Sequence, residues 1–379
     1  MEKRIIQIAQ PSMGADEWEA VKATIESGWI TQGPKVAAFE KMFAQKHHVK
    51  HALAVSNCTT ALHLALIACG IKEEDEVIVP AFTWVSTANA VMYCKAKPVF
   101  IDINLATFNI DIAQIKNKIT SRTKAIIPVH LFGLCVNVDA IRQNFPQLKI
   151  IEDAACAAGA AVNNKSAGSL GDIGCFSFHP RKSVTTGEGG MLTTNDDAIA
   201  EHLNMLRNHG ASIAEEQRHN GAKPYLLPDY NIIGYNYRMT DLQGAIGEVQ
   251  LRKIDTFINE RNEWAAFYTK ELKNISWLRT PVVPGGYKHG WQSYVTLIDE
   301  EKSPLKRNEL MEALQQQGIS TRPGTHAVHI LGAYAKRFNL APQDFPNAYK
   351  ANEYSMSLPL HNRMRKEDYE YVVAAIKSF

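Results

Sequence analysis

The chain has 379 residues, of which 45% are hydrophobic and 21% are charged, a composition typical of a globular protein with one or two domains. Its 41 basic and 39 acidic side chains leave a formal charge of +2, which does not indicate nucleic acid as a main partner. The absence of an apolar run of about 18 residues argues against a membrane-spanning helix. The basic N-terminus lacks the apolar core and small-residue cleavage site of a signal peptide.

Six cysteines and one pair of histidines bear on redox state and metal binding. The cysteines occupy positions 58, 69, 94, 135, 156 and 175 and form no C-x-x-C pair. In a chain of this length they are expected to be reduced, mostly buried thiols of a cytoplasmic protein. His326 and His329 have a spacing found in zinc sites, but no third ligand accompanies them, so we expect no metal.

Helices and apolar strands alternate along the first 153 residues. Helices are expected at 15–28, 36–48, 58–69, 85–94, 111–118 and 138–145. Strands are expected at 51–56, 76–80, 97–102, 124–130 and 148–153. These strands are continuous apolar runs, which is typical of strands buried on both faces. The pattern therefore predicts a mostly parallel sheet with helices on each side.

The remaining sequence predicts two short strands, a long loop and a smaller α+β region. The short strands lie at 172–178 and 189–194 and flank a polar segment. The predictions for the rest are a loop at 209–232, a long helix at 240–274, a strand at 293–299 and a helix at 304–318. We therefore expect a large α/β domain over residues 1–250 and a small C-terminal domain over residues 251–379.

Polar residues follow several of the predicted strands, where ligands gather in open α/β sheets. Residues 56–60, Ser-Asn-Cys-Thr-Thr, open a helix whose free N–H groups and hydroxyls suit a phosphate. Taken alone, however, these residues favour simple capping of the helix by Ser56, Asn57 or Thr59. Trp84 follows the strand at 76–80 and is placed either to stack on a flat ligand or to pack against the protein.

The strand at 148–153 ends in two adjacent acids. Neighbours on a strand point to opposite faces, so Glu152 and Asp153 cannot both face one core, and we expect one of them to point into a pocket. The alternatives are a helix cap or a surface pair.

Lys182 lies between the two short strands, ahead of the turn Gly-Glu-Gly-Gly. A lysine beside a pocket can form a Schiff base. The sequence has neither the P-loop pattern nor a G-x-G-x-x-G between a strand and a helix, so it does not support a nucleoside triphosphatase or a dinucleotide enzyme. Schiff-base chemistry with pyridoxal phosphate needs a lysine, an acid for the ring nitrogen, a phosphate cradle and a flat partner for the ring. Lys182, Asp153, residues 56–60 and Trp84 offer one of each.

Five long motifs in order resemble those of the DegT-type sugar-nucleotide aminotransferases, a branch of the fold-type I pyridoxal-phosphate enzymes. They are GWITQGPKVAAFE (28–40), VIVPAFTWVSTANAV (77–91), IEDAACAAGA (151–160), FSFHPRKSVTTGEGGM (176–191) and YNYRMTDLQGAIG (235–247). The resemblance covers nearly the whole chain. It implies an aspartate-aminotransferase-like fold with a mostly parallel sheet of the seven-stranded type.

The resemblance also implies roles for residues of this chain. Lys182 would form the Schiff base and carry the proton, while Asp153 would pair with the ring nitrogen. Trp84 would stack on the ring and Cys156 would border it, at a position where many relatives have Gln or His. The remaining cofactor contacts would be Cys58, Thr59, Thr60 and Ser177 around the phosphate, with Asn236 reaching the phosphate of the other subunit of a homodimer.

Substrate contacts are expected from Arg238 at that subunit boundary and from the segment 320–329. In that segment Arg322 suits a diphosphate, and His326 and His329 suit a sugar hydroxyl or phosphate. For each of these residues the alternative is a structural role, either in an ion pair or in an ordered loop.

The resemblance implies transamination at a keto carbon, usually C4, of a nucleotide-linked deoxysugar, with L-glutamate as donor. Pyridoxamine phosphate would be the intermediate form, and the product would enter a surface polysaccharide, a lipopolysaccharide O-antigen or a glycosylated metabolite. One alternative is amination of a keto-cyclitol or an aromatic precursor. Another is a non-catalytic sensing protein, which the intact Lys182 and the absence of an appended DNA-binding helix pair disfavour. No motif specifies the nucleotide base.

Overall fold

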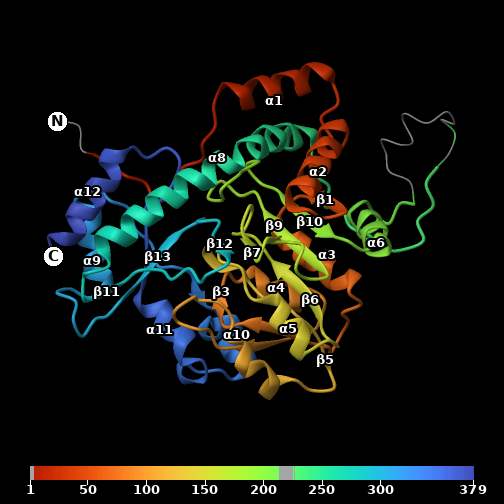
Figure 1. The fold of residues 1–379 in the computed structure, drawn as a ribbon. Coiled ribbons are helices and arrows are strands. Elements are labelled where there is room, and N and C mark those ends of the chain that lie inside the picture. The colour runs from red at the N-terminus through yellow and green to blue at the C-terminus, as the bar shows by residue number, and fades with distance from the viewer. Residues whose placement is uncertain (1–3, 213–224, 226) are drawn as a thin grey trace.

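Seven strands form the central sheet of the computed structural model, which describes residues 4–212, 225 and 227–379 (Figure 1). Their spatial order is β1-β10-β9-β6-β5-β2-β4. Their bounds are β1 (His51–Val55), β2 (Glu76–Pro80), β4 (Lys97–Ile101), β5 (Thr123–Ile126), β6 (Lys149–Asp153), β9 (Ile173–Ser177) and β10 (Gly190–Thr194). The pairs from β4 to β9 are parallel, whereas β10 runs antiparallel to both β9 and β1. The predicted mostly parallel α/β sheet is thus confirmed.

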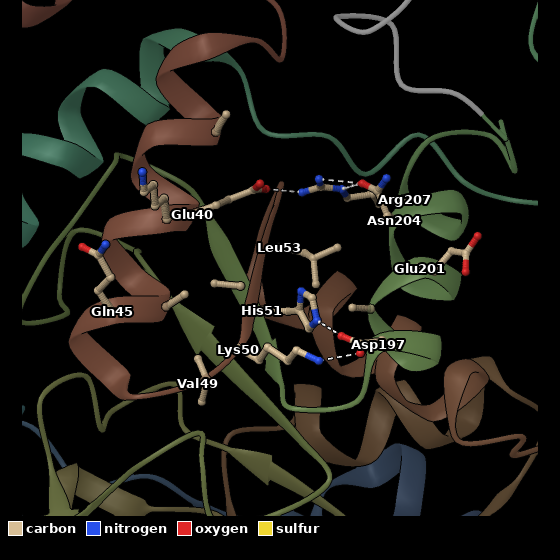
Figure 2. A pocket seen from close by; sticks show the side chains of 15 residues that line it. Glu40, Gln45, Val49, Lys50, His51, Leu53, Asp197, Glu201, Asn204 and Arg207 are labelled. Carbon is tan, nitrogen blue, oxygen red and sulfur yellow. Dashed lines mark hydrogen bonds and ion pairs between the residues drawn. The ribbon is translucent and has the colours of Figure 1, made fainter.

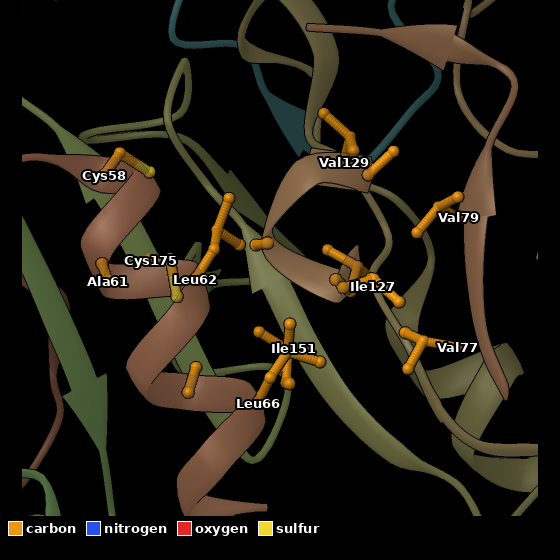
Figure 3. Close-up of a cluster of buried hydrophobic side chains, with 14 of the residues drawn as sticks. Cys58, Ala61, Leu62, Leu66, Val77, Val79, Ile127, Val129, Ile151 and Cys175 are labelled. Atoms are coloured by element: carbon orange, nitrogen blue, oxygen red, sulfur yellow. The ribbon is translucent and has the colours of Figure 1, made fainter. Parts of the chain in front are cut away.

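Helices cover both faces of this sheet. The face covered by α3 (Cys58–Ala68), α4 (Ser86–Tyr93) and α6 (Asp197–Arg207) forms one apolar cluster, in which Leu62 and Leu66 of α3 lie against Ile151 of β6 (Figure 3). The other face packs against α2 (Pro34–His47), α5 (Val138–Asn144) and α8 (Asp241–Leu272). Side chains alternate between the two clusters along each strand, as a sheet buried on both faces requires.

A buried aspartate joins two of the motifs that are far apart in sequence. Asp241, the first residue of α8, accepts hydrogen bonds from the backbone N–H groups of Gly33, Lys35 and Val36 at 2.8, 3.0 and 2.9 Å. These donors belong to the start of α2, whose first N–H groups have no partner inside the helix. Helix α1 (Ala15–Ser27) packs along α8 next to this junction.

A second, three-stranded antiparallel sheet organises the C-terminal part. It contains β11 (Leu278–Arg279), β13 (Tyr294–Ile298) and β15 (Ser355–Leu358), and it packs with α9 (Arg307–Gln316), α12 (Lys366–Lys377) and the end of α8. Ile6 also belongs to this cluster and forms a bridge with Ile319. The predicted domain boundary after residue 250 falls inside α8, which contributes side chains to both cores, and it stays a prediction.

Short elements connect the two parts. One two-stranded sheet pairs β3 (Phe82–Thr83) with β14 (His326–Ala327), and another small sheet contains β7 (Ala161–Val162), β8 (Lys165–Ser166) and β12 (Tyr287–Lys288). The remaining elements are η1 (Ile112–Lys118), η2 (Leu131–Gly133), η3 (Val328–Ile330), α10 (Gly332–Phe338), η4 (Pro342–Asp344) and α11 (Pro346–Tyr354).

The structure corrects several predicted elements. Residues 112–118 form a 3-10 helix where an ordinary helix was expected. Strand β5 ends at Ile126, although a strand was expected to continue to residue 130. Pro128 lies in this run and has no N–H group that could donate a hydrogen bond to a neighbouring strand. Helix α6 was not predicted, and most of the predicted loop at 209–232 lies outside the described residues. None of the described helices is long and apolar enough to cross a membrane.

Candidate active site

The predicted chemistry gathers at one edge of the large sheet, where β1, β2, β6 and β9 end and β10 begins. Gly190 of β10 pairs with Val55 of β1 on one side and with Ser177 of β9 on the other. The segment between β9 and β10 carries Lys182 back over this edge. A lysine therefore lies at the carboxyl ends of the parallel strands, where open α/β sheets bind ligands.

The loop that carries Lys182 is held by its own backbone hydrogen bonds. Phe178 N–H donates to the carbonyl of Gly189 at 2.9 Å, and Lys182 N–H donates to the carbonyl of His179 at 2.8 Å. The half-buried Lys182 directs Nζ at Cys156, with 3.1 Å between Nζ and Sγ. Burial lowers the pKa of Lys182, but the attraction of Cys156, Cys58 and Asp153 outweighs it and leaves that pKa raised.

Asp153 ends β6 and is 4% exposed, so its carboxylate depends on protein donors. Oδ2 accepts from the hydroxyl of Thr87 at 2.7 Å, and Oδ1 accepts from the N–H of Ala155 at 3.2 Å. Burial raises the pKa of Asp153 in the cofactor-free protein, and these bonds together with Lys182 and His130 only partly offset that effect. A cation placed next to this carboxylate would recover part of the desolvation cost.

Glu152 points to the other face of β6 and is also fully buried. Its carboxylate accepts from Nε2 of His130 at 2.7 Å and from the backbone N–H groups of Gly168, Leu170 and Gly171 at 2.7, 2.8 and 2.6 Å. Because both acids are buried, the alternative of a surface pair is wrong, and the expectation that Asp153 points into a pocket stays a prediction. Both carboxylates are buried because each has its own set of donors.

Residues 56–60 at the start of α3 were expected either to bind a phosphate or to cap the helix, and the structure leaves room for both roles. Asn57 is the N-cap and accepts from the N–H of Thr60 at 3.0 Å, while the hydroxyl of Thr60 donates back to the carbonyl of Asn57 at 2.7 Å. Thr60 is therefore engaged in capping, and its assignment to the phosphate stays a prediction. Cys58 and Thr59 occupy the first two helical positions, whose N–H groups have no carbonyl partner within a helix. These positions suit an anion.

Gly190 lets the sheet approach this helix start closely. A Cβ at Gly190 would lie 2.5 Å from the carbonyl carbon of Asn57 and 2.8 Å from the backbone nitrogen of Cys58. The adjacent Ser177 is half-buried, and its hydroxyl oxygen accepts from the N–H of His179 at 3.4 Å. The glycine therefore keeps Ser177 and the first turn of α3 next to each other.

The pairing of β3 with β14 brings the C-terminal segment to Trp84. His326 lies opposite Thr83, and its ring meets the exposed indole of Trp84 edge-on at 5.4 Å between centroids. Arg322 is exposed and forms backbone hydrogen bonds with Ser357. His329, in contrast, is fully buried and packs edge-on against Phe345, so the structure does not place it at a substrate.

The segment 235–238 runs beside the end of β1. Ser56 N–H donates to the carbonyl of Tyr237 at 2.8 Å, while the Asn236 side chain remains exposed. Arg238 donates to the side-chain oxygen of Asn208 at 2.7 Å, which is a neutral partner and not the ion pair considered as an alternative. In the part of the chain that the structure describes, neither Asn236 nor Arg238 forms a hydrogen bond with Lys182 or Asp153.

Sequence reasoning missed Thr87 and His130. Both act through residues distant in sequence, and a single threonine or histidine in an apolar segment has no distinguishing pattern.

The conspicuous cavity between α2, β1 and α6 is a different place (Figure 2). Its lining includes ion pairs of Arg207 with Glu40 and of Asp197 with both Lys50 and His51, and it contains none of the predicted site residues. Within the described residues, no cluster of three His, Cys, Asp or Glu could hold a metal ion.

The donor set fits pyridoxal phosphate by its chemistry. Lys182 offers an amine for the aldehyde, and Asp153 offers a buried carboxylate for a protonated ring nitrogen. The helix start at Cys58 and Thr59, with Ser177, offers donors for the phosphate, and Trp84 offers an exposed aromatic face. Each part of the cofactor thus has a matching group at the same sheet edge.

Comparisons with known proteins agree with this fit. Residues 11–377 match the model of the DegT/DnrJ/EryC1/StrS aminotransferase family. The spore coat polysaccharide biosynthesis protein SpsC of Bacillus subtilis is 41% identical over 373 residues, covering 97% of this chain and 95% of SpsC. The GDP-perosamine synthase of Caulobacter vibrioides is 39% identical over 375 residues, covering 98% of this chain and 97% of that protein. Spr1654 of Streptococcus pneumoniae, solved in PLP and PMP forms, superimposes with a TM-score of 0.89 at 26% identity, covering 99% of this chain and 97% to 98% of the solved chains.

Proposed function

Because the chain belongs to the DegT/DnrJ/EryC1/StrS aminotransferase family, we propose that it transfers an amino group from L-glutamate to C4 of a nucleotide-linked keto-deoxysugar. It is a pyridoxal-phosphate-dependent sugar-nucleotide aminotransferase. The observation that carries the proposal is the meeting of Lys182, Asp153 and the start of α3 at one sheet edge. Bound pyridoxal phosphate supplies a ring that accepts the electrons released when the amine is transferred.

We assign the two central roles to Lys182 and Asp153. Lys182 would hold the cofactor through Nζ and, once released, move a proton between donor and cofactor. Asp153 would keep the ring nitrogen protonated, since a buried carboxylate favours a neighbouring cation. The rigid end of β6 and the hydrogen-bonded loop around Lys182 fix both groups before the substrate binds, which is an orientation effect.

The phosphate and the ring would be held by the residues around these two. The N–H groups of Cys58 and Thr59 and the hydroxyls of Thr59 and Ser177 are assigned to the phosphate. Trp84 would cover one face of the ring, with His326 beside it. Exposed Arg322 belongs to the same C-terminal segment and would meet the diphosphate of the sugar nucleotide.

We further propose a homodimer in which Asn236, with Arg238 nearby, contributes to the site of the other subunit. Asn236 is exposed, and so are large apolar side chains close to it in sequence, with Ile233 93% and Leu227 79% exposed. Exposed apolar side chains in such density are typical of a surface that another protein covers. A second copy of the chain is the partner that the shared-site arrangement requires.

The nucleotide-sugar substrate is favoured by the names of two similar proteins, a GDP-perosamine synthase and a spore coat polysaccharide protein. On this proposal the product is an amino sugar for a surface polysaccharide or a glycosylated metabolite. A keto-cyclitol or aromatic precursor is the alternative substrate class, and no observation in the structure favours it.

The test is product analysis with a panel of substrates. The cofactor-loaded protein is incubated with L-glutamate and with GDP-, UDP- or dTDP-linked 4-keto-6-deoxyhexoses, and separately with a keto-cyclitol. Formation of an amino sugar nucleotide with an equal amount of 2-oxoglutarate is the expected result. Turnover of the keto-cyclitol alone would overturn the substrate class while leaving the aminotransferase chemistry in place.

A further inference from the structure

Cys156 lies in a turn that fixes it against the catalytic lysine. The turn directly follows Asp153, and Ala157 N–H donates to the carbonyl of Ala154 at 2.9 Å. The Cys156 side chain is half-buried, and Sγ accepts from Nζ of Lys182 at 3.1 Å. The lysine is therefore held by a thiol at a position where the resemblance leads one to expect Gln or His.

This thiol differs from the other cysteines near the site. Burial raises the pKa of the Cys58 and Cys175 thiols well above their usual range, so these two stay protonated. Cys156 instead meets an ammonium group directly. An ammonium group and a sulfur atom at this distance can share a proton, because the distance leaves no room for a water that would separate the two groups.

We propose that Cys156 is a positioning residue that holds Nζ of Lys182 and exchanges a proton with it. In one state the ammonium donates to the thiolate. In the other state the Nζ–H bond has broken and an Sγ–H bond has formed, so that the amine and the thiol are both neutral. No proton enters from solvent and the total charge of the pair does not change. The exchange provides a neutral amine with a free lone pair, which is the form that can react with an aldehyde.

Other charged groups facing the pair set its behaviour. Asp153 on β6 acts on Lys182, and His130 acts on Asp153. On the loop that carries the lysine, His179 is flanked by Arg181 and Glu188. Asp153 favours the ammonium form of Lys182. Cys156 is close enough to accept a proton from that ammonium group and to return it. Two groups coupled this closely titrate as a pair.

The test uses the full-length protein without cofactor, so its result does not depend on the proposed function. The inference itself rests on that function, because only there does Lys182 react with an aldehyde. Iodoacetamide labelling of Cys156 is followed by peptide mass spectrometry over a pH series in wild type, Lys182→Met and Lys182→Arg. The Met variant keeps the shape of the side chain without its charge, and the Arg variant keeps a charge. Circular dichroism and thermal unfolding check that each variant is folded, and Lys182→Gln replaces the Met variant if it is not.

The expected result is that Cys156 in wild type and Lys182→Arg is labelled at lower pH than in Lys182→Met, with about a tenfold difference in rate at neutral pH. Equal rates in wild type and Lys182→Met at every pH would overturn the inference.

A second readout uses the spectrum of the loaded protein. The pH at which the visible absorption band changes is compared in wild type, Cys156→Ser and Cys156→Ala. Removing a negatively charged partner weakens proton binding at Nζ, so the midpoint should move to lower pH in both variants, further in Cys156→Ala than in Cys156→Ser. Identical midpoints in all three proteins would also contradict the inference.

Discussion

The hydroxyl of Thr87 donates a 2.7 Å hydrogen bond to Oδ2 of Asp153, joining α4 to the end of β6 inside the protein. The bond favours the charged carboxylate against the burial that raises its pKa. Thr83 lies 3.0 Å from the Thr87 hydroxyl and completes a short chain from β3 to the acid. Asp153 therefore depends on a hydroxyl that lies within the motif at 77–91 but was not singled out there as a site residue.

Replacing Thr87 by Val should weaken the role of Asp153 without changing the shape of the site. The loss of a hydrogen bond to a charged group corresponds to about 1.5–3 kcal/mol, or roughly a tenfold to hundredfold loss in kcat/KM. The measurement is the steady-state rate with L-glutamate and a keto sugar nucleotide. Thr87→Ser retains the hydroxyl and is the matched control. Equal losses in the Val and Ser variants would show that packing and not the hydrogen bond matters.

The Asp153→Asn variant should be more stable than wild type at neutral pH when both proteins are free of cofactor, although it should lose most of its activity when loaded. Because burial raises the pKa of Asp153, the folded state binds more protons than the unfolded state between the usual pKa and the raised one. Stability should therefore fall as pH rises through that window, and the penalty is complete above the raised pKa.

The Asn variant lacks this penalty, so thermal unfolding of the cofactor-free proteins should show its advantage over wild type growing from acid to neutral pH. Its turnover should be largely lost, since an amide cannot neutralise a protonated ring nitrogen. An advantage for the variant that is the same at every pH would contradict the assigned ionisation.

Glu152 is a structural acid, and its loss should be costly to the fold. Glu152→Gln would place an amide NH₂ among donors that now point at carboxylate oxygens, including the N–H groups of Leu170 and Gly171. Urea unfolding should show a loss of about 2–5 kcal/mol, as expected when one partner of a buried charged network is changed. The exposed Glu301→Gln is the control and should leave the midpoint unchanged.

The shared-site proposal can be tested with hybrid dimers. Co-expression of Lys182→Ala and Asn236→Ala chains with different affinity tags allows the hybrid to be purified. One site of the hybrid then has both mutations and the other has neither, so about half of the wild-type rate per dimer is expected if Asn236 acts across the subunit boundary. If Asn236 acts within its own subunit, each site carries one mutation and the activity should stay low.

The sequence allowed the central architecture and the main site to be predicted for a physical reason. Strands buried on both faces are continuous apolar runs, and each polar residue that interrupts such a run marks a strand end, as at Ser56 and Asp153. Lys182 stood out because a lysine between two buried strands is unusual.

What could not be predicted depends on contacts between distant segments. Thr87 meets Asp153 and His130 meets Glu152 only once the sheet has formed, and the placement of His326 on Trp84 requires the pairing of β14 with β3. The burial of both Glu152 and Asp153 follows from donors in loops that have no regular sequence pattern. The engagement of Thr60 with Asn57 is local, but capping and phosphate binding use the same residue types.

The most direct test of the central claim is chemical trapping of the cofactor on Lys182. The protein is loaded with pyridoxal phosphate, reduced with borohydride and digested, and the modified peptide is identified by mass spectrometry, with the visible spectrum recorded before reduction. We expect a visible band and a cofactor attached to Lys182, with both absent from a folded Lys182→Ala variant. A cofactor trapped on another lysine, or an unchanged visible band in Lys182→Ala, would contradict it.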